Sequence, residues 1–252
     1  MKRVDAPRSC WKRWCVLTAD LERLGLRPGD WLLDAGCGGG RHAFGALERG
    51  GHVVGVDLDM EGLKLARAGI HERRGSASEK LHGGVLQGNV FGLPFPDDSF
   101  DRVICAEVME HVHNYPAAIR ELVRVLRPGG TMGLTIPTAI TEHVYLRLTH
   151  EYFESPGGHI RIFRPRELAQ AMSRAGLQVT GVSFAHALHS PYWALRCVLG
   201  LNDETPSPTR AYRKFLIRAT HSRFWQRVER TLDWVWPKSL VLYGTRLARG
   251  RG

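Results

Sequence analysis

A glycine-rich turn after a short apolar run constrains this chain more than any other feature. Residues Leu32 to Phe44 read LLDAGCGGGRHAF, so the apolar run ends in Asp34, several glycines follow, and a helical pattern begins at Arg41. Glycine lets a strand turn tightly into a helix and lets the backbone approach a ligand closely. The pattern therefore predicts a strand–turn–helix unit of an α/β fold, with a ligand on the turn.

A second acidic residue narrows the choice of ligand. Asp57 ends the next apolar run, HVVGVD, and an acid at that place suits the two hydroxyls of a ribose. A dinucleotide fingerprint, G-x-G-x-x-G, would need its third glycine at position 41, which is Arg41. Asp34 stands just before the turn, where it would repel a phosphate and suit a cationic amino group. We therefore expect a nucleoside cofactor that places no phosphate on the turn.

The motifs along the first half of the chain resemble those of class I S-adenosylmethionine-dependent methyltransferases. The turn from Asp34 to Gly40 matches the family's first motif, D-x-G-x-G-x-G, in the branch with the signature LDxGCGxG. Residues 87–112, QGNVFGLPFPDDSFDRVICAEVMEHV, are similar to the next two motifs, and residues 126–137, LRPGGTMGLTIP, to the turn into a fifth strand. One glycine motif would be weak, but the ordered set is strong. The alternative is a different nucleotide-binding Rossmann domain.

The resemblance implies S-adenosylmethionine as the cofactor and assigns its parts to separate residues. Asp34 and the Gly36 backbone would hold the methionine end, Asp57 would accept the ribose hydroxyl protons, and Leu58 would lie on the adenine. Asn89 replaces a common aspartate, and its amide oxygen can still accept from the adenine amino group; a plain turn residue is the alternative. The expected cofactor site comprises Asp34, Gly36, Cys37, Gly38, Gly40, Asp57, Leu58, Asn89, Val90 and Ala106.

Histidines near the expected reactive end are candidates for a general base. A hydroxyl acceptor benefits from a base that removes its proton, and histidine is the usual choice near neutral pH. His111 follows the expected fourth strand, and His159 lies in GGHIRIF, which is similar to a family segment that borders the acceptor pocket. We prefer these two over His143 and His150, and a structural role is the alternative for each.

Two carboxylates, Glu110 and Glu142, are weaker base candidates. No spacing of His, Asp or Glu residues predicts a metal site.

Composition and charge limit the partners. The net charge of +10 suggests nucleic acid, but no DNA- or RNA-binding motif accompanies it. The excess charge suits three other roles: attraction of an anionic small molecule, peripheral contact with a membrane surface, or a solvated surface. No apolar run is long enough to span a bilayer, the N-terminus lacks the apolar core of a secretory signal, and five cysteines without a C-x-x-C pair suit a reducing cytoplasm. A homodimer is compatible with these features.

Strands alternating with helices predict a parallel, doubly wound sheet. The expected strands are residues 31–34, 53–57, 84–87, 102–106, 131–136, 178–185 and 239–247. The expected helices are residues 9–25, 41–48, 60–68, 116–126, 165–175, 192–199 and 209–236, with a loose connection over 69–84. The resemblance implies a Rossmann-like sheet of seven strands, six parallel and the seventh antiparallel.

A long interval separates the expected sixth and seventh strands. Residues 188–238 hold nine Lys or Arg against four Asp or Glu and are expected to form a helical insertion that caps the substrate. A dimerisation arm or a brace against the sheet is the alternative. Around it we place a helical segment, 1–30, over the cofactor site and a core of residues 31–187 and 239–252.

The predicted activity is transfer of a methyl group from S-adenosylmethionine to a small molecule. The preferred acceptor is a hydroxyl oxygen, either phenolic, isoprenoid, of a natural product or of a sugar. Three alternatives stay open: an RNA methyltransferase attracted by the basic surface, a C- or N-methyltransferase of the same fold, and a binding protein without catalysis.

Overall fold

A seven-stranded sheet forms the centre of the computed structural model, which describes residues 16–76, 81–149, 158–200 and 207–247. The strand order is β3-β2-β1-β4-β5-β7-β6; the pairs from β3 to β5 are parallel, and β7 runs antiparallel to both β5 and β6. The strands are β1 (Trp31–Ala35), β2 (His52–Asp57), β3 (Gly83–Gln87), β4 (Phe100–Ala106), β5 (Leu126–Pro137), β6 (Leu177–Ala185) and β7 (Ser239–Arg246). The predicted Rossmann-like sheet with an antiparallel seventh strand is confirmed.

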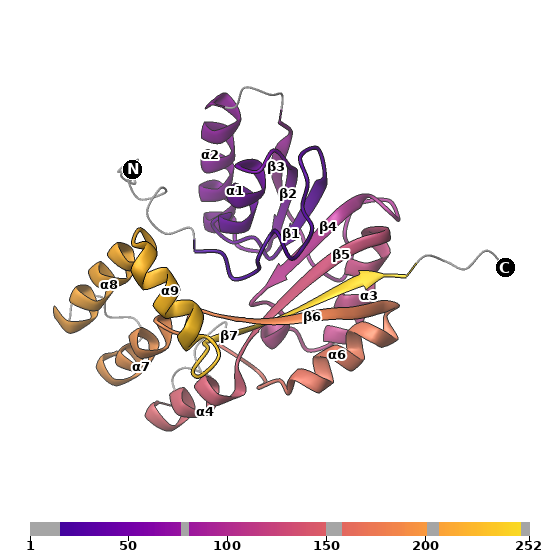
Figure 1. Cartoon of the computed structure of the whole chain (residues 1–252). Coiled ribbons are helices and arrows are strands. Elements are labelled where there is room, and N and C mark those ends of the chain that lie inside the picture. The colour runs from indigo at the N-terminus through magenta and orange to yellow at the C-terminus, as the bar shows by residue number, and fades with distance from the viewer. Residues whose placement is uncertain (1–15, 77–80, 150–157, 201–206, 248–252) are drawn as a thin grey trace.

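Helices cover both faces of this sheet (Figure 1). They are α1 (Arg41–Leu47) and α2 (Met60–Ser76) on one face, and α3 (Tyr115–Val125) and α6 (Pro165–Arg174) on the other. Successive side chains of a strand point to opposite faces, so neighbouring residues of β1 serve different cores. Leu32 packs in the cluster that holds Phe44 of α1, whereas Leu33 packs with Ile119 of α3 and Met172 of α6.

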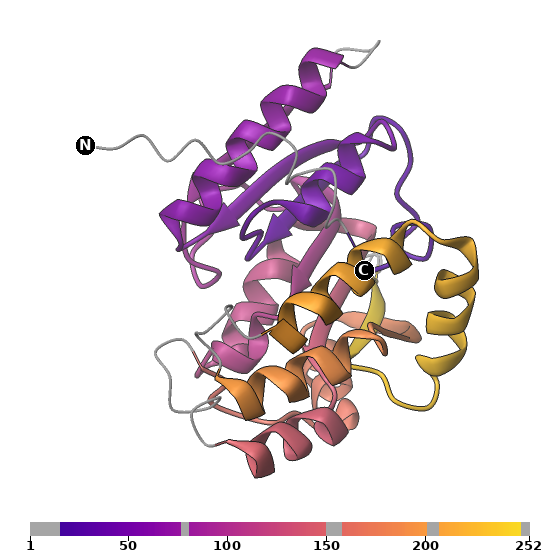
Figure 2. The same cartoon turned by 90° about the vertical axis from the view of Figure 1, so that its left-hand side faces the viewer.

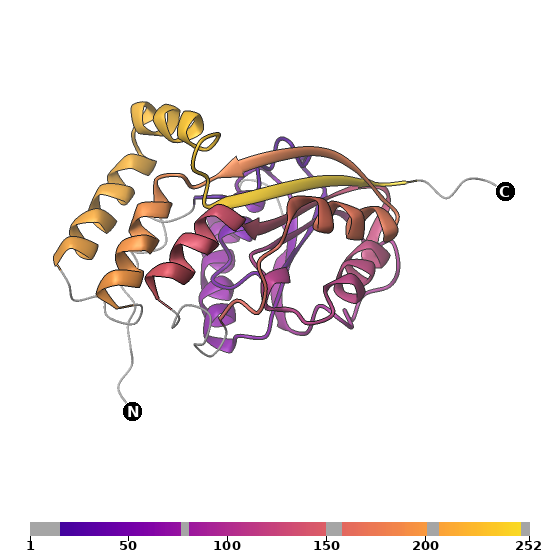
Figure 3. The same ribbon diagram turned by 90° about the horizontal axis from the view of Figure 1, so that it is seen from below.

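A separate group of helices lies beyond the ends of the parallel strands (Figures 1 to 3). It consists of α4 (Ala139–Leu148), α7 (His189–Leu199), α8 (Ser207–Thr220) and α9 (Arg223–Leu232). The helices between β6 and β7 have a small core of their own, formed by Leu188, Tyr192, Leu216 and Ala219. The Tyr145 hydroxyl of α4 donates to the Ser190 carbonyl at 3.0 Å, which joins α4 to α7. The helical insertion is therefore present where it was predicted.

The single helix predicted over 209–236 is wrong, because α8 ends at Thr220 and α9 begins at Arg223. Ser222 starts the second helix, since its hydroxyl accepts from the Trp225 N–H at 3.5 Å. The apolar spacing continues across the break because Phe215 and Trp225 both pack against the same small core. Periodicity alone therefore did not reveal the turn.

Two other helices differ from their predictions. Helix α2 continues to Ser76 through residues predicted as a loose connection. Gly69 lets this helix pack closely on the Phe44 ring of α1, because a Cβ there would lie 2.3 Å from the ring. Helix α4 was not predicted.

The helix predicted over 9–25 falls partly on residues outside the described ranges, and its remainder, 16–25, forms bends and turns. Leu21 and Leu24 are nevertheless buried, as the apolar spacing indicated.

Within the described ranges, no helix is both long enough and apolar enough to cross a membrane.

Candidate active site

The glycine turn between β1 and α1 has the backbone geometry that only glycine adopts easily. Gly36, Gly38 and Gly40 all have positive φ angles, of 75°, 47° and 87°. A Cβ on Gly36 would lie 2.2 Å from a methyl carbon of Val108, whereas one on Gly38 would meet nothing within 4 Å. The turn is thus packed against Val108 at Gly36 and open at Gly38, which leaves its backbone accessible to a ligand.

Asp57, at the end of β2, reaches across to this turn. Its carboxylate accepts hydrogen bonds from the Gly38 N–H at 2.7 Å and from the Asp59 N–H at 2.9 Å. Each carboxylate oxygen can accept a further hydrogen bond. The side chain is therefore fixed at the turn and still able to accept from a pair of vicinal hydroxyls, as predicted for a ribose.

Asp34 is fully buried at the end of β1 and only half satisfied. Oδ2 accepts from the Ala43 N–H at 3.1 Å, while Oδ1 has no hydrogen-bond partner. Burial raises the pKa of this carboxyl group to about 7. An unpartnered buried carboxylate oxygen below an open glycine turn fits the cationic methionine end of S-adenosylmethionine, so the residues present suit this cofactor.

The residues expected around the adenine lie beside the turn. Leu58 is exposed after β2, and the Gln87 side-chain amide donates to its carbonyl at 3.0 Å. The Asn89 amide oxygen accepts from the Phe91 N–H at 3.0 Å, so one lone pair remains for an adenine amino group. Val90 is buried after Asn89. Cys37 is a buried thiol, and burial raises its pKa, which agrees with a small packing residue.

A charged network that the sequence did not predict begins where β4 ends. After the buried Ala106, Glu107 has a positive φ of 56°, which turns the chain out of the strand. Its carboxylate accepts from the Thr135 hydroxyl at 2.9 Å and from the Lys238 ammonium at 3.1 Å. Burial would raise the pKa of Glu107, but the Lys238 charge outweighs it and lowers the pKa. Glu107 is therefore ionised and ties β4 to the end of the insertion.

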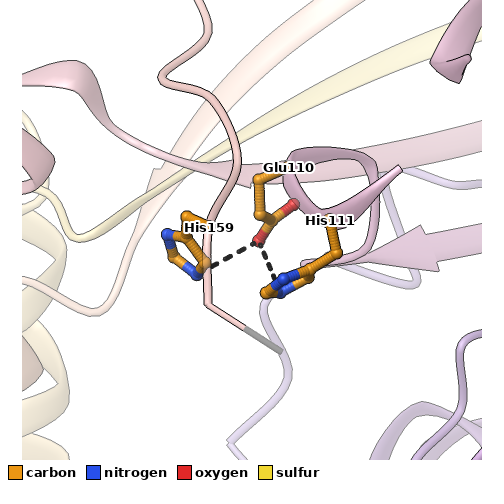
Figure 4. A group of neighbouring side chains, drawn as sticks. All are labelled: Glu110, His111 and His159. Atoms are coloured by element: carbon orange, nitrogen blue, oxygen red, sulfur yellow. Dashed lines mark ion pairs between the residues drawn. The ribbon is translucent and has the colours of Figure 1, made fainter. Parts of the chain in front are cut away.

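Glu110 lies one turn further on, between the two preferred histidines (Figure 4). It is buried, and neither of its carboxylate oxygens has a hydrogen-bond partner. Oε1 lies 4.0 Å from Nε2 of His111 and 3.9 Å from Nε2 of His159. Burial, reinforced by the nearby Glu107 charge, raises the pKa of Glu110 well above its usual range. This shift favours the protonated form of Glu110, in which the carboxyl group is a hydrogen-bond donor as well as an acceptor.

His159 forms an acid–base pair with Glu142 of α4. Nδ1 of His159 lies 2.6 Å from a carboxylate oxygen of the buried Glu142. This contact places the proton of the neutral imidazole on Nδ1 and leaves the Nε2 lone pair directed at the space near Glu110. The His111 ring packs edge-on against that of His159, with centroids 4.8 Å apart, and its Nδ1 contacts the Gly158 carbonyl at 3.1 Å. Burial lowers the pKa of His111, which keeps it neutral.

The two preferred histidines therefore lie together, and the weaker candidates Glu110 and Glu142 join them. We refer to Glu110, His111 and His159 as the acid–base cluster. His143 is an exposed residue of α4 whose Nδ1 contacts the Ala139 carbonyl at 2.5 Å, and His150 lies outside the described residues.

The ligand atoms of the acid–base cluster lie within 4.8 Å of one another. One carboxylate oxygen and two imidazole nitrogens are donors that divalent cations accept. A second such group, His186, His189 and Glu229, joins α7 and α9. Neither was predicted, because each joins segments distant in sequence.

Comparison with known proteins decides the family. A family model described as a methyltransferase domain matches residues 33–134. The ubiquinone biosynthesis O-methyltransferase of Aromatoleum aromaticum is 30% identical over 183 residues, which are 70% of this chain and 74% of that protein. The chain belongs to the class I S-adenosylmethionine-dependent methyltransferases. S-adenosylmethionine is accordingly its methyl donor.

Other known proteins resemble this methyltransferase over different shares of its length. The sterol 24-C-methyltransferase ERG6B of Gibberella zeae is 38% identical over 112 residues, which are 44% of this chain and only 28% of that protein. The YcgJ protein of Bacillus subtilis shares the fold, with a TM-score of 0.59 and 22% identity over 91% of this chain and 97% of that one.

Proposed function

We propose that this methyltransferase methylates a hydroxyl oxygen of a small, largely apolar acceptor, with His159 as the general base. The contact between His159 and Glu142 carries the proposal, because it leaves Nε2 able to take a proton while a carboxylate stabilises the imidazolium that results. The ubiquinone biosynthesis O-methyltransferase, similar over most of its length, supports a phenolic or isoprenoid acceptor.

The cofactor supplies a methyl group on a positively charged sulfur that leaves as a neutral thioether. Asp34 and Asp57 would hold the cofactor at the turn, where it would supply the methyl group. His159 Nε2 would remove the hydroxyl proton of the acceptor, which makes the oxygen a better nucleophile.

Two neighbouring segments support a closed acceptor site. Thr18 and Ala19 donate their backbone N–H groups to Nε2 of the buried His42, at 3.2 and 3.3 Å, which holds the N-terminal segment over α1. Lys238 ties the end of the insertion to Glu107. We propose that these segments exclude water from the acceptor. The buried free thiols of Cys37, Cys105 and Cys197 also support the expected cytoplasmic location.

Methylation of carbon is the second candidate, because the sterol relative is named for it. The 112 residues that match that relative amount to 44% of this chain, whereas the match to the O-methyltransferase extends over 70%. The longer match favours oxygen. The basic surface that suggested RNA has no recognition motif, and RNA serves as a competing substrate in the test.

In the test, the unmodified protein (the parent) is incubated with labelled cofactor and three acceptors. They are a prenylated catechol, the same compound with its hydroxyls blocked, and tRNA. We expect label in the free catechol alone, at oxygen by nuclear magnetic resonance. His159→Ala should lower kcat by roughly 10²–10⁴-fold and leave the cofactor dissociation constant unchanged.

His143→Ala is the matched control, since it removes an exposed imidazole from α4 without touching the cluster. Glu142→Gln should lower kcat less than His159→Ala and shift the pH profile, since Glu142 positions the base. Label in tRNA, or equal kcat for His159→Ala and parent, would contradict the proposal.

A further inference from the structure

Helix α9 presents a surface that the methyl-transfer site does not use. None of its ten residues is buried, although it is an internal helix of the insertion. Phe224 is 65% exposed, Val235 in the turn that follows is 70% exposed, and Leu232 is 38% exposed. Phe224, Val228 and Leu232 follow the spacing i, i+4 and i+8, which places them along one side of the helix, and Val235 lies in the turn beyond its end. An apolar stripe of this kind is uncommon on a surface that faces only water.

The arginines of α9 are exposed, whereas its carboxylate and that of Asp233 contact residues around the start of α7. Arg223, Arg227 and Arg230 are exposed, and none of them forms an ion pair within the described residues. The carboxylates instead face inward: Glu229 lies 3.5 Å from Nδ1 of His189, and Asp233 accepts from the Ala187 N–H at 2.8 Å. Arg230 lines a different hollow, together with Glu229 and Asp233, whereas Arg227 lines the groove beside Phe224 and Val228. The apolar stripe is therefore accompanied by positive charge from Arg223 and Arg227. We call Arg223, Phe224, Arg227, Val228, Leu232 and Val235 the α9 face.

The position of the α9 face leaves it free to meet a large, flat partner. Figures 2 and 3 show α9 along the outer edge of the insertion, beyond the ends of the parallel strands. A groove of about 350 Å³ lies along it, lined by Phe224, Arg227, Val228, Thr231 and Leu232. An apolar stripe flanked by arginines is the composition of a helix that lies in a membrane interface, with its apolar side chains among the acyl chains and its charges at the headgroups.

We propose that the α9 face docks on the surface of a bilayer that contains anionic lipids. The arginines of the α9 face complement negatively charged headgroups, and the apolar stripe gains from burial in the apolar layer. RNA fits less well, because Phe224 is the one aromatic side chain of the α9 face, and Val228, Leu232 and Val235 offer neither stacking nor hydrogen bonds to bases. A second copy of this chain fits less well too, because an isologous contact would bring the arginines of both copies together without a carboxylate.

Docking would place the insertion, whose helix α7 is joined to α4 beside the acid–base cluster, next to the lipid phase. An isoprenoid acceptor dissolved in the bilayer could then be taken up without crossing water. This consequence for the acceptor rests on the proposed function, whereas docking itself does not.

The test is flotation of the full chain with vesicles of phosphatidylcholine alone or with about one third phosphatidylglycerol, in low and high salt. We expect flotation with the anionic vesicles, and a marked decrease in high salt. The double variant Arg223→Gln, Arg227→Gln should lower the partition coefficient at least about tenfold. Phe224→Ser with Val235→Ser should lower it by a similar factor. All of these positions are exposed, so the variants should fold, and thermal melting will verify this.

The matched control is Arg67→Gln with Arg120→Gln, which removes the same charge from exposed positions on α2 and α3. It should float like the parent. The proposal is overturned if the parent does not float in low salt, if the variants of the α9 face float like the parent, or if the control loses as much binding as they do. It is also overturned if the α9 variants abolish a dimer or tRNA binding while vesicles are ignored. Methyl transfer to a soluble prenylated catechol is measured separately, so failure of docking and failure of the proposed function are distinguishable.

Discussion

Replacing Asp57 by alanine tests the cofactor assignment most directly. The carboxylate holds the Gly38 N–H at 2.7 Å and the Asp59 N–H at 2.9 Å, so it is already oriented for the two ribose hydroxyls. A hydrogen bond to a charged group contributes about 1.5–3 kcal/mol, and two such bonds therefore contribute about 3–6 kcal/mol. Since 1.4 kcal/mol is a factor of ten, Asp57→Ala should raise the cofactor dissociation constant by roughly 10²–10⁴-fold. The variant also loses the hydrogen bond from the Gly38 N–H, which should loosen the glycine turn and weaken cofactor binding further.

Isothermal titration with S-adenosylhomocysteine measures this change, and circular dichroism verifies that the variant is folded. Asp57→Asn keeps the shape and one carbonyl oxygen, so its loss should be intermediate. His159→Ala and His111→Ala are the controls and should bind the cofactor within about twofold of the parent, because neither residue contacts the glycine turn. If a folded Asp57→Ala protein also bound within about twofold of the parent, the ribose assignment would be refuted.

Three further predictions concern the same site. Because burial raises the pKa of Asp34 to about 7, titration calorimetry should find S-adenosylmethionine bound more weakly below pH 7, by up to about tenfold per pH unit, and Asp34→Asn should flatten this dependence. Gly36→Ala should lower the free energy of unfolding in urea by about 2–4 kcal/mol, since it combines a positive φ with a clash against Val108, whereas Gly39→Ala should have little effect, because a Cβ there meets nothing within 4 Å. Methyl transfer should survive chelation by EDTA, because the proposed base is His159; loss restored by added Mg²⁺ would instead make the acid–base cluster a set of metal ligands.

The strands and the cofactor side of the site could be predicted because their signals are local. Each strand of the parallel sheet is a short apolar run, and β1 and β2 end in the acids that face the glycine turn. Asp34, Gly36 and Asp57 lie within 24 consecutive residues, and the turn dictates how they meet. The turn also shows why Gly40 is needed, since its left-handed backbone begins α1.

The residues of the acid–base cluster and Glu142 could be predicted only as separate candidates for a general base. His159 and Glu142 are 17 residues apart, and the chain between them includes residues outside the described ranges. Whether they meet depends on how α4 packs, and α4 itself gave no clear pattern because its buried residues include Glu142 and Thr141 beside Tyr145. The pairing of Glu107 with Lys238 spans 131 residues and likewise depends on the completed sheet. Side chains that meet only through tertiary packing are not marked by a characteristic spacing in the sequence.

The distribution of charge relates the cofactor to the rest of the molecule. The chain carries a net charge of +10, yet carboxylates gather where the parallel strands end. Besides burial, the charges of Glu110, Asp34 and Asp57 all raise the pKa of the Cys105 thiol, so these groups act on one small region at the end of β4. An acidic site within a basic protein attracts the cationic methyl donor and favours it over the product, whose sulfur is neutral after transfer. The positive charge that remains, much of it on the insertion, is then available for a different, anionic partner. The α9 face is where that charge coincides with exposed apolar side chains.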